Sequence, residues 1–453
     1  MHSSKASIRS RTLAGAAALA IGCITSGTAF GQDMGSNNPY SPAHGHPYRH
    51  GVVPTREAWQ HMKEYADHNA RPGGGGSGKT LSYGGGVDGI GVTSGSPKVY
   101  LVVWGTQWGS QSGNSFSGDS AGAVPRLINM FSGLGTGGEL WSGVMTQYCD
   151  GAVSAGATSC PSGSSHVGYP SGAYAGIWYD NSAAAPSNAT ANQIGTEAVR
   201  AAAHFGNTTP ASNRYVQYVI LSPSGTHPDG FNTPQGTFCA WHDWNGDPYV
   251  GVSSSYGDIA FTNMPYVLDL GASCGQNFVN AGSAGTLDGF TIVEGHEYSE
   301  TITDQNPAGG WTSASSGQEN ADECSWISSG QGASANVVMG NGTYAMQSTW
   351  SNDTNQCDIA HAIVTNGGGG GGGPTANFSY VANGTTVQFT DTSTDTSATI
   401  TAHAWTFGDG GTSTATNPSH AYAKPGTFSV SEKVTDSNGA TSTKTASVKV
   451  AKH

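Results

Sequence analysis

The feature that most constrains the fold of this chain is a run of seven glycines, Gly367 to Gly373, that follows Asn366. Glycine has no side chain to bury, and such a run behaves as a flexible tether. A single hydrophobic core cannot extend through it, so we predict two independently folding units. The main domain is expected over residues 97–365 and a small C-terminal domain over residues 374–453, joined by the linker 366–373.

The two units differ in their sequence patterns. In the main domain, buried strands such as Lys98 to Trp104 and Tyr215 to Leu221 alternate with helical patterns such as Ala191 to Phe205. This alternation predicts an α/β or α+β domain. Beyond the linker no helical period occurs, and short alternating runs such as Thr427 to Val434 are separated by turns. We therefore expect a small all-β sandwich there.

The N-terminus has the pattern of an export signal. Three basic residues precede an apolar run from Leu13 to Ile24, and small residues follow up to Gly31. We predict a signal peptide over residues 1–31 and a secreted protein, extracellular or periplasmic. Lipoprotein anchoring at Cys23 is not expected, because Ala20 stands where leucine is usual. No other apolar run approaches the length of a transmembrane segment.

Residues 32–96 are predicted to be a leader, and a removable propeptide is one interpretation of them. They are rich in proline and glycine and contain one short helical pattern, Thr55 to His68. The whole chain has a formal net charge of −13 and no cluster of Lys and Arg beyond the N-terminus. Nucleic acid is therefore not an expected partner.

Six cysteines remain after the predicted signal peptide, which in an exported chain indicates disulfides. Pairing neighbours in sequence closes the shortest loops. We predict the pairs Cys149–Cys160, Cys239–Cys274 and Cys324–Cys357.

A helical pattern from Thr286 to Thr303 carries the residues most typical of a metal site. His296 and Glu300 are four residues apart, so their side chains project from one face of a helix. Glu297 is a neighbouring carboxylate that could accept a proton from a metal-bound water, and Glu319 and Asp322 follow in the next segment. A second interpretation is a solvated acidic face, since Glu294 also lies at helical spacing.

Two further residues are candidates for lining a cleft. His242 is flanked by Trp241 and Trp244 and could orient a substrate, but a buried, hydrogen-bonded structural histidine is the other interpretation. Asp304 could reach the same face as His296 or could cap the end of the helix.

The C-terminal unit resembles a PKD domain, an Ig-like β-sandwich module. The matching motifs are Ala376-Asn377-Phe378, Phe389-Thr390-Asp391, the stretch Trp405 to Gly410 (WTFGDG) and His420-Ala421-Tyr422. In secreted bacterial enzymes such modules are usually non-catalytic appendages. The resemblance implies a role in spacing, or in binding polysaccharide or protein.

The main domain resembles the EXORDIUM-like (phosphate-induced protein) family. The matching pieces are Val99 to Trp104, Phe238 to His242, His296 to Asp304, Glu319 to Cys324 and Gln347 to Asn352. Its H-E-x-x-E motif is similar to the H-E-x-x-H signature of zinc metallopeptidases, which implies a zincin-like domain with a sheet packed on the active-site helix.

That resemblance implies a role for each residue of the motif. His296, Glu300 and Glu319 would be metal ligands, Glu297 the general base, and Asp322 a partner that orients His296. Zn²⁺ is the expected cofactor, and another divalent cation is the alternative, since a carboxylate in place of imidazole favours harder cations.

Two functions follow as expectations. The first is a secreted metal-dependent hydrolase, an endopeptidase acting on proteins or peptides. The second is a non-catalytic extracellular protein that binds cell-wall polymer or carbohydrate and has a structural or vestigial metal site.

Overall fold

The computed structural model describes residues 34–69, 79–365, 374, 376–395, 399–436 and 441–451. The predicted signal peptide, Cys23 and the linker 366–373 lie outside these residues. Among the residues described, no helix is both long and apolar enough to cross a membrane.

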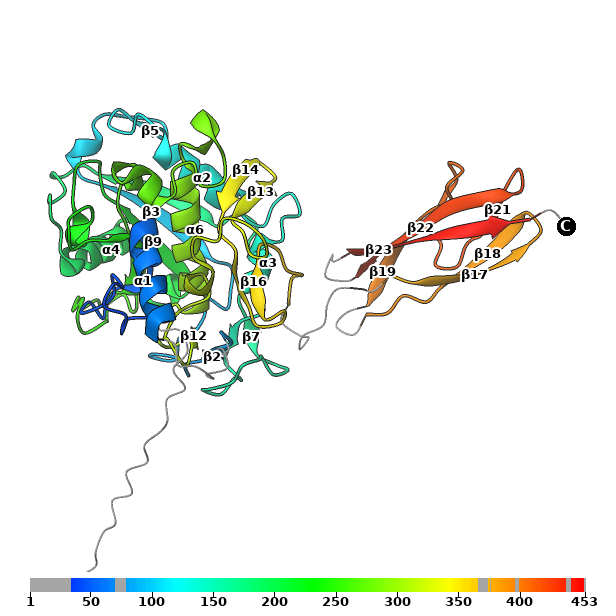
Figure 1. The fold of residues 1–453 in the computed structure, drawn as a ribbon, viewed down its shortest axis with the longest axis horizontal. Coiled ribbons are helices and arrows are strands. Elements are labelled where there is room, and N and C mark those ends of the chain that lie inside the picture. The colour runs from blue at the N-terminus through cyan, green and yellow to red at the C-terminus, as the bar shows by residue number, and fades with distance from the viewer. Residues whose placement is uncertain are drawn as a thin grey trace, which may run out of the picture.

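The main domain is built on a mixed six-stranded sheet (Figure 1). Strands β8, β3, β9 and β11 run parallel, whereas β10 is antiparallel to β11 and β1 is antiparallel to β10. In sheet order the strands are β1 (His50–Pro54), β10 (Phe238–Trp244), β11 (Ala260–Met264), β9 (Val216–Leu221), β3 (Lys98–Trp104) and β8 (Tyr174–Asp180). The mixed α/β class expected from the sequence is therefore confirmed.

Six α-helices and several two-stranded sheets surround this sheet in the described part of the domain. The helices are α1 (Arg56–Asn69), α2 (Ala123–Gly133), α3 (Trp141–Met145), α4 (Ala191–His204), α5 (Pro210–Asn213) and α6 (Asp288–Thr303). The paired short strands are β2 (Leu81–Tyr83) with β12 (Trp311–Ser313), β4 (Gln111–Ser112) with β5 (Ser115–Phe116), β6 (Cys149–Asp150) with β7 (Ser165–His166), β13 (Ala335–Met339) with β14 (Gly342–Met346), and β15 (Thr349–Ser351) with β16 (Gln356–Asp358).

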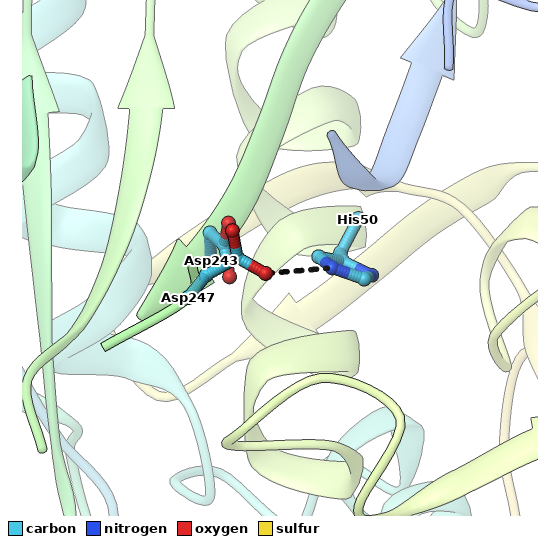
Figure 2. A group of neighbouring side chains, drawn as sticks. All are labelled: His50, Asp243 and Asp247. Carbon is cyan, nitrogen blue, oxygen red and sulfur yellow. Dashed lines mark ion pairs between the residues drawn. The ribbon is translucent and has the colours of Figure 1, made fainter. Parts of the chain in front are cut away.

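The segment expected to be a leader contributes to the central sheet. Strand β1 is the edge strand beside β10, and His50 at its start faces Asp243 of β10 and Asp247 in the following turn (Figure 2). The buried guanidinium of Arg49 donates to Asp229 Oδ2 at 2.7 Å. The sheet of the main domain thus begins near residue 50, well before residue 97.

The three predicted disulfides are confirmed. Cys149–Cys160, Cys239–Cys274 and Cys324–Cys357 are all formed. The last two lie close in sequence to candidate site residues: Cys239 is on β10 with His242, and Cys324 is two residues after Asp322.

The C-terminal unit is all-β, as expected. One sheet contains β17 (Phe378–Asn383), β18 (Thr386–Asp391) and β21 (Ser419–Ala421), and the other contains β20 (Thr412–Ser413), β19 (Ile400–Thr406), β22 (Gly426–Asp436) and β23 (Thr441–Val450). Side chains from both sheets form one core around the buried Trp405. In its WTFGDG turn Gly408 has φ +79°, and a Cβ there would lie 2.5 Å from the carbonyl oxygen of Ser429.

Candidate metal centre

Helix α6, which carries the H-E-x-x-E motif, is a central helix of the main domain (Figure 1). All sixteen of its residues are buried, and it packs against β1, β10 and β14. The side chains of Glu294, Glu297 and Glu300 have no exposed surface. The interpretation of this helix as a solvated acidic face is therefore wrong. Its carboxylates are held in the interior, where an ionised group requires a partner.

The side chains of His296, Glu300 and Asp322 converge on one point beside helix α6. His296 Nε2 lies 3.0 Å from Glu300 Oε2 and 3.5 Å from Asp322 Oδ1. Ligand atoms about 2.0–2.1 Å from a tetrahedral zinc ion are about 3.3 Å apart. The observed spacing therefore fits one small divalent cation between the three side chains.

The local backbone explains how Asp322 comes to lie beside the helix. Asp322 begins a short 3-10 helix, Asp322–Cys324, and the backbone N–H groups of Ala321 and Asp322 donate to Glu300 Oε1 at 3.1 and 2.8 Å. Glu300 Oε1 thus holds the segment that carries Asp322, and Glu300 Oε2 is directed at His296.

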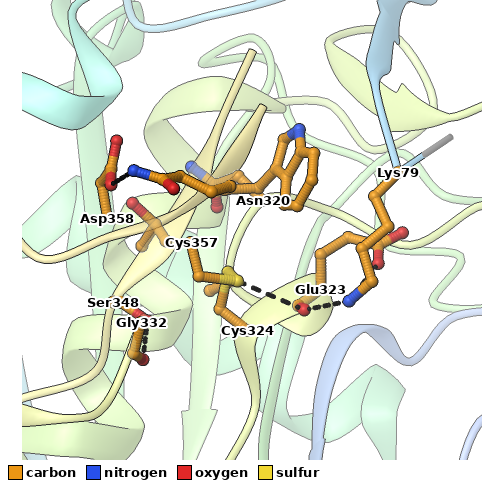
Figure 3. Close-up of a disulfide and its surroundings, with 12 residues drawn as sticks. Lys79, Asn320, Glu323, Cys324, Gly332, Ser348, Cys357 and Asp358 are labelled. Atoms are coloured by element: carbon orange, nitrogen blue, oxygen red, sulfur yellow. Dashed lines mark hydrogen bonds and ion pairs between the residues drawn. A yellow bond between two sulfur atoms is a disulfide. The ribbon is translucent and has the colours of Figure 1, made fainter. Parts of the chain in front are cut away.

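The disulfide Cys324–Cys357 anchors the same segment to strand β16 (Figure 3). Beside it, the Glu323 carboxylate pairs with Lys79 Nζ at 3.3 Å, and the Glu323 carbonyl accepts from that ammonium at 2.7 Å. These contacts reduce the freedom of the chain immediately after Asp322.

His242 is the site residue whose role the sequence left open. It is fully buried on β10, with Nδ1 3.1 Å from Glu297 Oε2 and Nε2 3.5 Å from Glu319 Oε2. The alternation of side chains along Phe238–Trp244 was the available signal, since it places His242 on one face of a strand. Nothing in the local sequence indicates that this face meets helix α6.

Glu319 and Asp304 are both buried and both line the cavity beside the site. Glu319 lies against His242, whereas Asp322 joins His296 and Glu300 in one group of mutually close ligand atoms. Asp304 ends α6, and its carboxylate accepts the backbone N–H groups of Ala308 and Gly310.

Several buried atoms of this cluster have no hydrogen-bond partner among the described residues. They are His242 Nε2, His296 Nε2, Glu297 Oε1, Glu300 Oε2 and Glu319 Oε2. Each unsatisfied buried polar atom costs about 1–3 kcal/mol. So many unsatisfied atoms around one point fit a site that binds a cation and a polar ligand.

The electrostatics of the cluster agree with this fit. Burial, with Asp322 nearby, raises the pKa of Glu300 to about 7, and burial raises the pKa values of Glu297 and Glu319 well above their usual range. Burial alone would lower the pKa of His296, but Glu300 and Asp322 outweigh it and raise that pKa. The carboxylates therefore retain protons or a cationic neighbour, and a divalent cation can replace both.

A cavity of about 530 Å³ adjoins the cluster. Asp304, Glu319 and Asp322 line one side, and residues of the 34–62 segment, including His50 and Gly51, line the other. Gly51 has φ +51°, and a Cβ there would lie 2.0 Å from Glu300 Oε2. The backbone of β1 therefore runs directly over the candidate ligands.

Comparisons with known proteins bear on the C-terminal unit. Residues 373–450 match the family model of the PKD domain. The chain carries a C-terminal PKD domain.

Solved PKD domains are similar to this segment in sequence. The PKD1 domain of Vibrio anguillarum Epp is 34% identical over 18% of this chain and 100% of its own, with a TM-score of 0.18. The PKD1 domain of the Vibrio cholerae metalloprotease PrtV is 37% identical over 17% of this chain and 98% of its own, with a TM-score of 0.17. The search of curated proteins finds no match to the chain.

Proposed function

We propose that the protein is a secreted metal-dependent hydrolase and that its substrates are peptides or proteins. The observation that carries the proposal is the convergence of His296, Glu300 and Asp322 at spacings suited to one cation, with Glu297 on the same helix. The three disulfides are typical of exported proteins.

In this proposal His296, Glu300 and Asp322 would hold the cation, Zn²⁺ in the first instance, and Glu319, which lines the cavity, lies against His242. The bound cation supplies Lewis acidity and lowers the pKa of water at the site. Glu297 accepts the proton of the attacking water and passes it to the leaving amine. His242, whose Nδ1 is 3.1 Å from Glu297 Oε2, fixes the orientation of that carboxylate.

The edge strand supports a peptide substrate. Strand β1 is the last strand of the sheet, and its residues His50, Gly51 and Val52 line the cavity together with Glu319 and Asp322. An extended peptide can pair with the free side of such a strand, which would draw a peptide bond past the ligands.

The test compares wild type with Glu297→Gln in metal content and in cleavage of an unstructured protein such as casein. The proposal expects about one cation per chain at the H-E-x-x-E motif and loss of cleavage when that cation is removed by a chelator. It expects Glu297→Gln to lose at least about a hundredfold in turnover while it retains that cation. Glu294→Gln is the matched control, because Glu294 lies one turn earlier on α6, is equally buried and belongs to no group of clustered ligands.

The alternative function, a non-catalytic extracellular protein that binds polysaccharide or cell-wall polymer, has a different outcome. It predicts no cleavage in any variant and retention of the chain on an insoluble polysaccharide. That result would overturn the hydrolase proposal.

A further inference from the structure

A second group of potential ligands lies where β1 meets β10. His50 begins β1, Asp243 is on β10 and Asp247 is in the turn that follows (Figure 2). Each offers one ligand atom within 4.8 Å of the other two, and His50 Nε2 lies 4.0 Å from Asp247 Oδ2. None of these residues belongs to the group formed by His296, Glu300 and Asp322.

The hydrogen bonds of the two aspartates leave one oxygen of each available. Asp243 is fully buried; its Oδ1 accepts from the backbone N–H of Trp244 at 2.8 Å, while Oδ2 has no hydrogen-bond partner. Asp247 Oδ1 accepts from the N–H of Tyr249 at 2.7 Å, and its Oδ2 is directed at His50. A buried, unsatisfied carboxylate oxygen beside a second carboxylate is unfavourable unless one group keeps a proton or a cation lies between them.

We propose that His50, Asp243 and Asp247 bind a second divalent cation, separate from the one at the H-E-x-x-E motif. Two carboxylate oxygens and one imidazole nitrogen suit Mn²⁺ or Zn²⁺ better than they suit Mg²⁺ or Ca²⁺, which prefer ligand sets made of oxygen atoms alone. Ligands about 2.2 Å from an octahedral ion are about 3.1 Å apart when adjacent and about 4.4 Å when opposite. The 4.0 Å spacing of His50 and Asp247 falls within that span, with water completing the coordination.

This cation would fasten the N-terminal edge strand to the sheet. His50 is the N-terminal residue of β1, and the next residue, Gly51, lies over Glu300 and His242. The backbone of β1 is otherwise held to the sheet by irregular pairing, with register shifts on both sides of Val53. The second site is therefore structural: it fixes the position of the strand that covers the candidate metal centre.

The experiment counts Mn²⁺ and Zn²⁺ bound per chain after loading and desalting. It compares wild type, His50→Gln, the double variant Asp243→Asn/Asp247→Asn, and His296→Gln. The proposal expects two cations in wild type and one in each of the three variants. It also expects added Mn²⁺ to raise the unfolding midpoints of the two variants by different amounts. The increase should be at least twice as large in His296→Gln, which keeps the second site, as in His50→Gln, which loses it.

The controls keep the outcome decisive. His44→Gln removes an exposed histidine of the same segment and should bind two cations. His50→Gln changes a partly exposed side chain, so it remains informative if the buried double variant does not fold. Equal cation content in His50→Gln and wild type, or a second cation bound only at millimolar concentration and in every variant alike, would overturn the proposal. Because cation content is read without a substrate, a chain that binds two cations but cleaves nothing would end the hydrolase proposal and leave this one standing.

Discussion

His242 Nδ1 lies 3.1 Å from Glu297 Oε2, and neither side chain has exposed surface. Burial, reinforced by the nearby His50 and His296, lowers the pKa of His242 well below its ordinary value, so the ring is neutral at pH 7. Burial raises the pKa of Glu297. One proton between the two groups satisfies both, and this pairing sets which way the Glu297 carboxylate faces.

The first prediction concerns this pairing. His242→Ala should lower the rate of substrate cleavage about 10–100-fold while the cation remains bound, because the ligands are intact and only the orientation of Glu297 is lost. The measurements are turnover and metal content on the same preparation. His227→Ala is the control, since His227 is a partly exposed histidine whose ring contacts the Phe231 carbonyl. Loss of the cation in His242→Ala would instead make His242 a ligand.

The second prediction is a pH dependence of cation binding. The pKa of Glu300 is raised to about 7, first by burial, so below pH 7 its carboxyl group is protonated in the metal-free protein. A cation must then displace that proton, and affinity should fall progressively below pH 7, approaching about tenfold per pH unit. Competition with a chromophoric chelator between pH 5.5 and 8 measures it.

A matched control for this pH dependence is Glu197→Gln. Burial raises the pKa of Glu197 to about 8, but its partners are Arg200 and Asp180 rather than the metal centre. The variant should keep the wild-type slope. An affinity that does not change from pH 8 to 5.5 would show that Glu300 is not a ligand.

The sequence correctly predicted the features of this fold that depend on residues close together in the chain. Strand β3 lies at its expected residues because its β-branched run fits a strand buried on both faces. Helix α6 ends at Thr303, before Pro307, as the helix-stopping effect of proline requires. Nearest-neighbour cysteine pairing was correct because short loops cost the least entropy to close.

The part that could not be predicted depends on contacts between distant segments. His50 pairs with His242 across 192 residues of sequence, and no local pattern indicates that the two lie side by side. The choice between Glu319 and Asp322 beside His296 depends on the backbone N–H groups that Glu300 binds, which are tertiary contacts. Spacing alone placed both carboxylates near the helix without ordering them.

The third prediction concerns the disulfide Cys324–Cys357, which holds the segment carrying Asp322 (Figure 3). Replacing both cysteines with alanine should lower the free energy of unfolding by about 2–4 kcal/mol, since a loop of 33 residues is released. It should also weaken cation binding, because Asp322 is no longer anchored. The control is the double replacement of Cys149 and Cys160, whose loss should cost a similar free energy of unfolding but leave the affinity unchanged. Equal affinities in the two variants would contradict the anchoring role.

The last prediction tests whether β1 is fitted to the metal centre. Gly51→Ala would place a Cβ 2.0 Å from Glu300 Oε2 and 2.5 Å from His242 Cε1, so the strand or the ligands must move. Gly45→Ala is the control, because Gly45 also has a left-handed φ, +77°, but its Cβ would meet nothing within 4 Å. Backbone strain alone costs about 1–2 kcal/mol, which both variants share. Gly51→Ala should lose at least about 1 kcal/mol more in the free energy of unfolding and bind the cation at least tenfold more weakly, measured by denaturant unfolding and chelator competition. If the two variants behave alike, β1 is not in close contact with the ligands.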